Sequence, residues 1–213
     1  DKLLQIAEQY NRKVIFYNIN AIEKIGIKIN NSVKKLAISA YGRIFLSSFL
    51  KDINKVIYMD CDSVITGSLN ELWNMDIVNY SIAGVLDNCK EEAKTRIGLD
   101  LKDVYINSGF MVMNLEKIRA ISGEEKMINF IKSYNGDVYH HDQGIINGVF
   151  KNDIMILEPK YNVMTPFFDM NVKRIKDLSK TDPYYSQSEL NEAKSNPIFV
   201  HFTPSYSKRP WFK

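Results

Sequence analysis

Short apolar runs alternate with amphipathic stretches along this chain. Four consecutive apolar residues, Val56–Met59, predict a strand buried on both faces, because such a run offers no polar side to solvent. Similar runs bounded by polar residues predict further strands. The predicted strands are residues 13–18, 56–59, 81–87, 105–115, 154–157 and 197–202.

The segments between these runs have helical periodicity. Residues 39–50 place Ile44, Phe45 and Phe49 toward a core, and Ser68 suits the N-cap of a short helix at 68–73. Further helices are predicted at residues 1–10, 115–134 and 142–150. Strands that alternate with helices predict an α/β domain with a mostly parallel, mixed, Rossmann-like sheet flanked by helices.

In two stretches the apolar residues follow neither the strand period nor the helix period. Residues 20–36 form a polar connector, and residues 165–196 predict a long irregular loop of the kind that covers active sites or binds partners. The first ten residues have the pattern of an amphipathic helix, with no strand before it. Because α/β chains usually open with a strand, we expect the first strand of this domain to lie outside these residues.

Composition narrows the class of protein. The 213 residues fit a single domain, 1–213, and 45% hydrophobic with 25% charged residues is ordinary for a globular enzyme. A net charge of +3, with Lys and Arg spread along the chain, predicts no nucleic-acid partner. Cys61 and Cys89 are too few for a disulfide framework or a zinc site, and no apolar run has the length of a membrane span.

Two carboxylates directly follow the predicted strand at 56–59, in the triplet Asp60-Cys61-Asp62. In open α/β sheets, ligands bind just beyond the carboxyl ends of the strands. A pair of carboxylates there suits a hard divalent cation that bridges to substrate phosphates. The same triplet also suits a solvated acidic turn, so it does not decide the question alone.

Other predicted strands also end in, or contain, polar groups suited to the same site: Asp87, Asn107 and His201. Gly109, inside the strand 105–115, predicts a close approach of backbone to another group. His201 is either a satisfied core residue or a third metal ligand, since imidazole and carboxylate both bind Mn²⁺. Together with the Asp60–Asp62 pair, these polar residues favour a single site at one edge of the sheet.

In this order, these segments resemble glycosyltransferase family 8, the retaining sugar-nucleotide transferases with the GT-A fold. The resemblance runs from about residue 13 to the end of the chain. The residues that carry it are Tyr41-Gly-Arg43, Tyr58–Asp62, Gly67–Trp73, Ala83–Asp87, Tyr105–Leu115, Asp142-Gln143, and His201 with Lys208-Arg-Pro210-Trp211.

The resemblance implies a role for each candidate residue. Asp60, Asp62 and His201 would hold Mn²⁺ or Mg²⁺ against the two phosphates of a UDP-sugar, and both aspartates would also contact the ribose or the sugar. The implied substrate contacts are Arg43 to the donor sugar or diphosphate, Asp87, Asn107 and Ser108 to sugar hydroxyls, and Lys208 to the leaving diphosphate.

The reacting carbon would lie over Gln143, with Asp142 orienting the sugar. Retaining glycosidic chemistry often uses a carboxylate nucleophile, and Gln143 is an amide, which is a poor one. A front-face mechanism, in which the leaving phosphate helps to deprotonate the acceptor, is therefore favoured. The cation and a lysine would stabilise that leaving group. Asp142 is the rival nucleophile.

The implied function is metal-dependent, retaining transfer of a hexose from UDP-glucose or UDP-galactose to a glycan or glycolipid, in the cytoplasm or at the inner face of the membrane. The tail from Tyr206 to Lys213 suits either contact with anionic lipid or packing. The alternatives are a nucleotidyltransferase and a non-catalytic sugar-nucleotide-binding module. The module is motivated by the expected missing strand and by Pro204, which replaces a glycine of the family's motif and lacks an N–H for phosphate.

Overall fold

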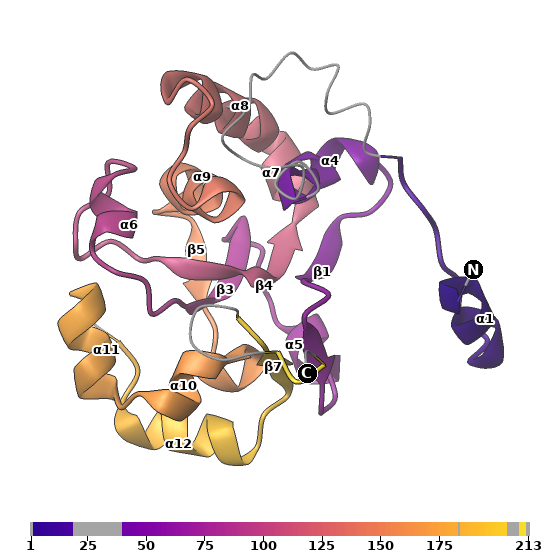
Figure 1. Cartoon of the computed structure of the whole chain (residues 1–213). Helices are drawn as coiled ribbons and strands as arrows, with labels where there is room; N and C mark the ends of the chain where they lie inside the picture. The colour runs from indigo at the N-terminus through magenta and orange to yellow at the C-terminus, as the bar shows by residue number, and fades with distance from the viewer. Residues whose placement is uncertain (1, 19–39, 183, 204–208, 212–213) are drawn as a thin grey trace.

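A four-stranded sheet forms the centre of the molecule (Figure 1). The computed structural model describes residues 2–18, 40–182, 184–203 and 209–211. The order of the strands is β1-β4-β3-β5, and β4 runs antiparallel to both of its neighbours while β3 and β5 are parallel. The strands are β1 (Lys55–Met59), β3 (Ile82–Leu86), β4 (Ile106–Asn114) and β5 (Ile154–Ile156).

The predicted α/β class is confirmed, and the direction of the strands refines it. β1, β3 and β5 share one direction, but β4 lies between β1 and β3 and opposes both, so the pairing is less parallel than expected. The beginning of β4 therefore meets the ends of β1 and β3 at one edge of the sheet. Asn107 reaches that edge from the start of its strand rather than from the end.

A second, three-stranded sheet has the order β2-β7-β6. We expected the strand at 197–202 in the main sheet, but β7 pairs with β2 and β6 instead. Ser63 of β2 lies opposite His201 of β7, directly after the Asp60–Asp62 turn. The turn thus leads into the strand that positions the histidine. The strands are β2 (Ser63–Ile65), β6 (Val163–Met164) and β7 (Phe199–His201).

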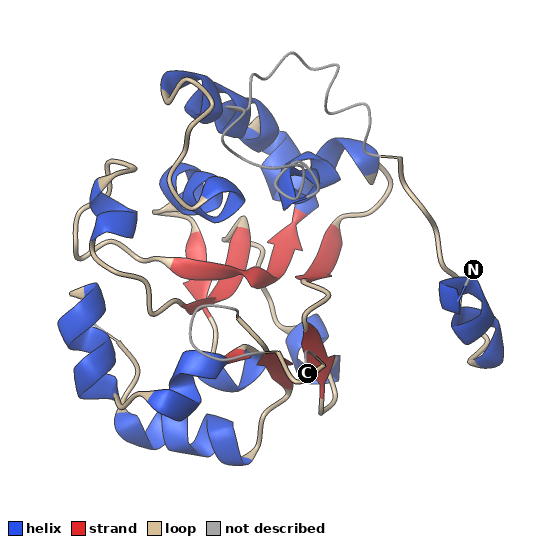
Figure 2. Cartoon of the chain, viewed as in Figure 1, coloured by secondary structure: helices blue, strands red, loops and turns tan. Residues whose placement is uncertain are grey.

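Side chains of β4 alternate between two hydrophobic clusters. Met111 and Met113 face one cluster, and Phe110 and Val112 face the other. Both faces of the central strands are therefore buried, which is the main source of stabilisation for such a sheet. Figure 2 shows helices on both sides. Those in the first cluster include α7 (Leu115–Ala120), α8 (Gly123–Ser133) and α9 (His141–Phe150); those in the second include α5 (Asn70–Asn74), α10 (Thr165–Asp169), α11 (Val172–Ser179) and α12 (Gln187–Ser195).

β1 differs from the strand that its apolar run predicted. Its residues are half-buried, with Met59 exposed, because β1 lies at the edge of the sheet. Within the described ranges, no strand pairs with its outer edge. The expectation of a further strand outside these residues stays a prediction.

Several helix boundaries also differ from the sequence analysis. The segment at 39–50 is a 3₁₀ helix, η1 (Tyr41–Phe45), followed by α4 (Leu46–Phe49). The segment at 115–134 is two helices, separated at Ser122, whose φ is 53°. The helix at 68–73 begins later, as α5, and two short helices were not predicted: α6 (Glu92–Thr95) and η2 (Pro159–Tyr161).

The prediction of an irregular loop at 165–196 is wrong. This stretch holds α10, α11 and α12, and Asn171 and Ser186 cap the last two by accepting hydrogen bonds from backbone N–H groups. Ser186 and Glu189 form a complete capping box, a pattern readable from Ser-x-x-Glu. None of the helices in the described ranges is long and apolar enough to cross a bilayer.

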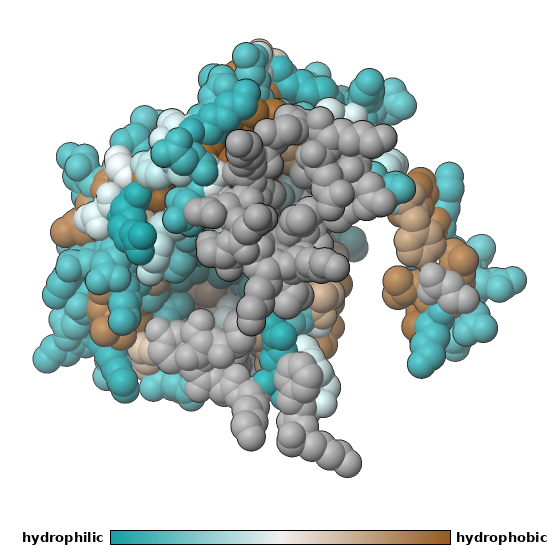
Figure 3. Space-filling view, turned by 45° about the horizontal axis from the view of Figure 1, so that its top comes forward, coloured by the Kyte–Doolittle hydropathy of each residue, from teal (hydrophilic) through white to brown (hydrophobic). Residues whose placement is uncertain are grey.

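The helix predicted at the start of the chain is present as α1 (Lys2–Gln9), apart from the rest of the molecule in Figure 1. Apolar residues on α1 and at 14–17 are exposed, as the brown surface of Figure 3 shows. Residues 13–18 form no strand, because no described strand pairs with them. The connector at 20–36, Pro204, Tyr206 and Lys208 lie outside the described residues.

We expect Ser186→Ala to lower the free energy of unfolding by about 1 kcal/mol, because an N-cap hydroxyl of α12 is lost. Urea denaturation at neutral pH measures this difference. Ser195→Ala, the same change at the other end of α12, is the control and should stay within about 0.5 kcal/mol. Equal effects of the two substitutions would contradict a capping role.

The capping box also carries a pH dependence. Hydrogen bonds from the Ser186 side chain and backbone lower the pKa of Glu189. A carboxyl whose pKa is lower in the folded state stabilises the fold above its unfolded pKa, and this contribution is lost as the pH falls through the folded pKa. The difference between the parent protein and Ser186→Ala should therefore shrink in acid.

Candidate active site

One cleft of about 630 Å³ opens at the sheet edge where β1 and β3 end and β4 begins, a size typical of small-molecule sites. It collects the candidate residues from distant parts of the chain. Lys208 lies outside the described residues. The other candidates all line the cleft: Arg43, Asp60, Asp62, Asp87, Asn107, Ser108, Asp142, Gln143 and His201.

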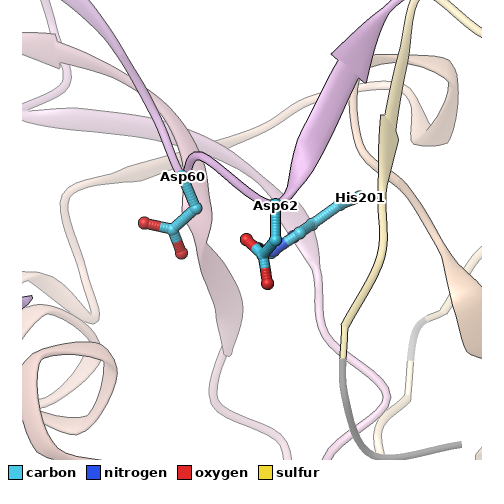
Figure 4. Close-up of side chains that lie close together, drawn as sticks. All are labelled: Asp60, Asp62 and His201. Carbon is cyan, nitrogen blue, oxygen red and sulfur yellow. Dashed lines mark ion pairs between the residues drawn. The ribbon is translucent and has the colours of Figure 1, made fainter. Parts of the chain in front are cut away.

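Asp60, Asp62 and His201 converge as the sequence predicted (Figure 4). One ligand atom from each residue lies within 4.8 Å of the other two. A single ion bonded at about 2.0–2.4 Å can span such a set. Asp60 follows β1, Asp62 precedes β2 and His201 ends β7, so both sheets build this cluster. The donor set therefore fits a divalent cation.

Gly109 makes room for this cluster. Its carbonyl accepts a hydrogen bond from the N–H of Asp60 at 2.8 Å. A Cβ at position 109 would lie 2.1 Å from Cε1 of His201 and 2.9 Å from Oδ2 of Asp60. The predicted close approach at Gly109 is thus confirmed, and its partners are two of the candidate metal ligands.

Arg43 connects the candidate metal ligands to the rest of the site. Its side chain is almost fully buried, with ion pairs to Oδ1 of Asp60 at 2.8 Å and to Oδ2 of Asp142 at 3.1 Å. It also donates to the backbone oxygen of Ser108 at 2.7 Å, and its guanidinium lies 4.3 Å from the ring centre of Tyr58. Tyr58 donates its hydroxyl to the same Oδ1 of Asp60, at 2.8 Å.

Asp87, which follows β3, forms a network of hydrogen bonds with polar side chains of β4 and α9. Oδ2 of Asp87 accepts hydrogen bonds from Nδ2 of Asn107 at 2.9 Å and from Nε2 of Gln143 at 3.0 Å. Oε1 of Gln143 accepts from the backbone N–H of Ser108 at 3.1 Å. The Ser108 hydroxyl donates to Asp142 at 3.0 Å. These residues form one continuous set of donors and acceptors, as suits the hydroxyls of a sugar.

Asn147 fixes this network, and the sequence analysis missed it. Its buried side chain accepts from the N–H of Ile106 at 2.7 Å and donates to the carbonyls of Ile106 and Gln143, each at 2.9 Å. These bonds hold α9 against the start of β4. The sequence could have indicated this role, because Asn147 is an amide one helical turn after Gln143.

The environment raises the pKa of Asp142 and lowers the pKa of Asp62. Burial raises the pKa of Asp142, although the Arg43 guanidinium and the Ser108 hydroxyl partly oppose it. The hydrogen bond with His201 is the largest cause that lowers the pKa of Asp62, and burial opposes it. The surroundings of Asp62 therefore favour the anionic form that a cation needs, and the Arg43 guanidinium favours the ionised form of Asp142 against the effect of burial.

Arg209 is a further cleft residue that the sequence analysis missed. Its Nη2 lies 2.6 Å from Oδ2 of Asp62. The sequence predicted Lys208 as the basic group of this segment, whereas Arg209, the next residue, directly precedes Pro210-Trp211. That adjacency was the available signal.

An aromatic wall was missed as well. Tyr139 and His140 both line the cleft and stack with ring centres 4.6 Å apart. Nδ1 of His140 forms a hydrogen bond with the hydroxyl of buried Tyr105 at 3.0 Å. A Cβ at Gly144 would lie 2.0 Å from the carbonyl oxygen of Tyr139, so glycine allows this turn to pack against α9. Their spacing in the sequence carried no signal for this arrangement.

Comparison with protein families gives a match along the whole sequence. The model of "Glycosyl transferase family 8" matches residues 1–213. A putative glycosyltransferase of Haemophilus influenzae is 33% identical over 161 residues, which are 74% of this chain and 48% of that protein. The lipopolysaccharide 1,3-galactosyltransferase of Salmonella typhimurium is 24% identical over 214 residues, which are 97% of this chain and 58% of that protein.

Among solved structures, the galactosyltransferase LgtC, crystallised with donor and acceptor sugar analogues, superposes with a TM-score of 0.72 at 23% identity. The match covers 95% of this chain and 69% of LgtC. This likeness shows the fold, which is of the GT-A type. The chain spans about half to three fifths of the two curated relatives, with 48% and 58% covered.

We expect Gly109→Ala to impair cation binding, because the added methyl group must displace the His201 ring or the Asp60 carboxylate. Isothermal titration with Mn²⁺ should show at least about a tenfold loss of affinity, the size expected when ligand orientation is disturbed. Circular dichroism should report a folded protein.

The matched control is Gly67→Ala. There the added carbon meets the flexible end of the Ile198 side chain, outside the cleft, and Mn²⁺ affinity should stay unchanged. A Gly109→Ala variant with full Mn²⁺ affinity would show that His201 and Asp60 do not share an ion.

Proposed function

The chain belongs to glycosyltransferase family 8, and on that basis we propose that it transfers a hexose from UDP-glucose or UDP-galactose to a glycan or glycolipid, with retention and with the help of a divalent cation. The observation that carries this proposal is the shared cleft of the Asp60–Asp62–His201 cluster and the Arg43–Asp142–Gln143 network. Candidate metal ligands that lie in one cleft with polar side chains able to bind sugar hydroxyls suit a nucleotide-sugar donor.

In this proposal, Asp60, Asp62 and His201 hold Mn²⁺ or Mg²⁺, since their oxygen and imidazole donors suit either ion. The bound cation would neutralise negative charge that develops on the leaving diphosphate. Arg209 lies beside Asp62 and adds a second positive charge there, whereas the role given to Lys208 stays a prediction.

Donor-sugar recognition is assigned to the polar network of the cleft. Asp87, Asn107 and Ser108 are already joined by hydrogen bonds around Gln143, so their remaining acceptors and donors have fixed directions. Arg43 is occupied by Asp60, Asp142 and Ser108. We therefore assign Arg43 mainly to ordering these groups around the donor.

The contacts of Asp142 favour the front-face mechanism over a covalent intermediate. Its Oδ2 is paired with Arg43 and accepts a hydrogen bond from the Ser108 hydroxyl, and both interactions withdraw negative charge from the carboxylate and reduce its nucleophilicity. Gln143 offers an amide oxygen that can face positive charge on the sugar without forming a bond. In this mechanism the leaving phosphate takes the proton of the acceptor hydroxyl.

The acceptor is proposed from relatives. One similar protein is a lipopolysaccharide galactosyltransferase, which favours a glycan or glycolipid acceptor. The expected location, in the cytoplasm or at the inner face of the membrane, stays a prediction. The absence of a nucleic-acid partner and the contact of the tail with lipid also stay predictions. Within the tail, the ring of Trp211 packs edge-on against that of Phe202, with ring centres 5.5 Å apart.

The test is an assay of UDP release from several UDP-sugars with Mn²⁺, using the full-length protein. Release from UDP-glucose or UDP-galactose supports the proposal. Activity only with a sugar phosphate and a nucleoside triphosphate supports a nucleotidyltransferase. No activity in a folded protein supports a non-catalytic sugar-nucleotide-binding module.

Asp62→Asn should abolish Mn²⁺-dependent UDP release, because the variant loses an anionic ligand of the cluster. Circular dichroism and the unfolding midpoint should change little, since Asp62 belongs to neither hydrophobic cluster and asparagine keeps an oxygen that can accept from Arg209. Asp177→Asn, on the exposed face of α11, removes the same charge and should keep full activity. Undiminished turnover by Asp62→Asn would exclude this metal site.

Gln143→Ala should lower kcat about ten- to a thousandfold, up to about 4 kcal/mol of barrier, with little change in UDP affinity. Steady-state kinetics and titration with UDP measure the two effects. Gln5→Ala, on exposed α1, is the control. If Asp142→Asn is far slower than Gln143→Ala, and mass spectrometry finds a glycosylated Asp142 peptide with a slow donor, the front-face mechanism is wrong.

A further inference from the structure

We propose that Arg209 is a built-in competitor of the divalent cation at Asp62, and that a diphosphate relieves this competition by attracting Arg209 to itself. Cation and diphosphate then bind cooperatively, each strengthening the other through one side chain. The identity of the anion rests on the proposed function, whereas the competition for Asp62 rests on the contacts below.

Both oxygens of Asp62 have partners within the described residues. Oδ2 lies 2.6 Å from Nη2 of Arg209, and Oδ1 lies 3.3 Å from Nε2 of His201. A guanidinium at that distance is a strong, charge-assisted partner for a carboxylate. A cation bound to Asp62 must therefore share it with Arg209 or displace it.

The charges around the cluster strengthen this competition. Asp60 and Asp62 each have an arginine as ion-pair partner, Arg43 for the first and Arg209 for the second. The net negative charge that attracts a divalent cation is correspondingly small. Two guanidinium groups within one cleft also repel the cation directly.

The two arginines differ in their freedom to move. Arg43 is 6% exposed and is held by two carboxylates, by backbone oxygens and by the ring of Tyr58. The Arg209 side chain is 30% exposed, and Asp62 is its one ion-pair partner among the described residues. Arg209 is therefore the arginine that can change its contact at the lower cost of the two.

Arg209 also has a hydrogen-bond donor without a partner among the described residues. Its Nε is buried and has no hydrogen-bond partner among the described residues, and the same is true of the hydroxyl of Thr203. Both residues line the cleft. A diphosphate beside the cation can satisfy these donors, since the planar guanidinium fork suits phosphate oxygens.

The test compares Mn²⁺ binding with and without pyrophosphate, a probe that carries the diphosphate and no nucleoside. Electron paramagnetic resonance of free Mn²⁺ gives both affinities in the full-length protein, after a protein-free titration has measured the Mn²⁺ that pyrophosphate itself binds. Arg209→Gln should bind Mn²⁺ alone about tenfold more tightly than the parent protein, and the gain in affinity caused by pyrophosphate should shrink by about the same factor.

Two variants provide controls. Arg209→Lys keeps the positive charge beside Asp62, so its affinity for Mn²⁺ alone should stay close to that of the parent protein, while the loss of the guanidinium fork should remove part of the gain caused by pyrophosphate. Arg174→Gln removes one positive charge from the exposed face of α11 and should change neither affinity. Circular dichroism confirms that each variant is folded.

The results separate this inference from the proposed function. Unchanged or weaker Mn²⁺ binding by Arg209→Gln, in a protein that still releases UDP from a UDP-sugar, would overturn the competition alone. Tighter Mn²⁺ binding and reduced coupling, without turnover of any UDP-sugar, would support the competition and overturn the proposed hexosyl transfer. Absence of Mn²⁺ binding to every variant, with and without pyrophosphate, would overturn both.

Discussion

The buried guanidinium of Arg43 is the interaction on which the site depends. It binds the carboxylates of Asp60 and Asp142 and the backbone of Ser108, so that acidic groups from separate segments share one cleft. Without this charge, Asp60 and the buried carboxylate of Asp142 would repel each other, and removing one member of a buried, paired set is costly. Ile44 and Phe45, buried beside Arg43 in η1, anchor it in the core.

The position of the cleft follows from the pairing of the strands. Because β4 runs against β1 and β3, its first residues reach the edge where those strands end. Asn107 and Ser108 are thereby placed beside Asp60 and Asp87. The second sheet then brings His201 to the same edge through the pairing of β7 with β2. The site therefore needs both sheets and cannot be formed by either alone.

The sequence predicted much of the candidate site because strand ends are recognisable. Apolar runs that stop at Asp60 or Asp87 indicate where polar side chains emerge, and such residues collect at one edge of a sheet. Asn147 and the Tyr139–His140 wall were missed, since their role depends on how α9 packs against β4. Arg209 was missed because the sequence does not show which of two adjacent basic residues, Lys208 or Arg209, pairs with Asp62.

By itself, the sequence determined the alternation of strands and helices over most of the chain, the buried character of β3 and β4, and the acidic residues Asp60, Asp62 and Asp87 that follow the strands. These are local properties, set by side-chain periodicity and by where apolar runs end. Only the tertiary structure decided the direction of β4, the separate sheet that carries β7, and the pairing of each carboxylate with its arginine. Those features depend on contacts between residues far apart in the chain, whose energies no local pattern records.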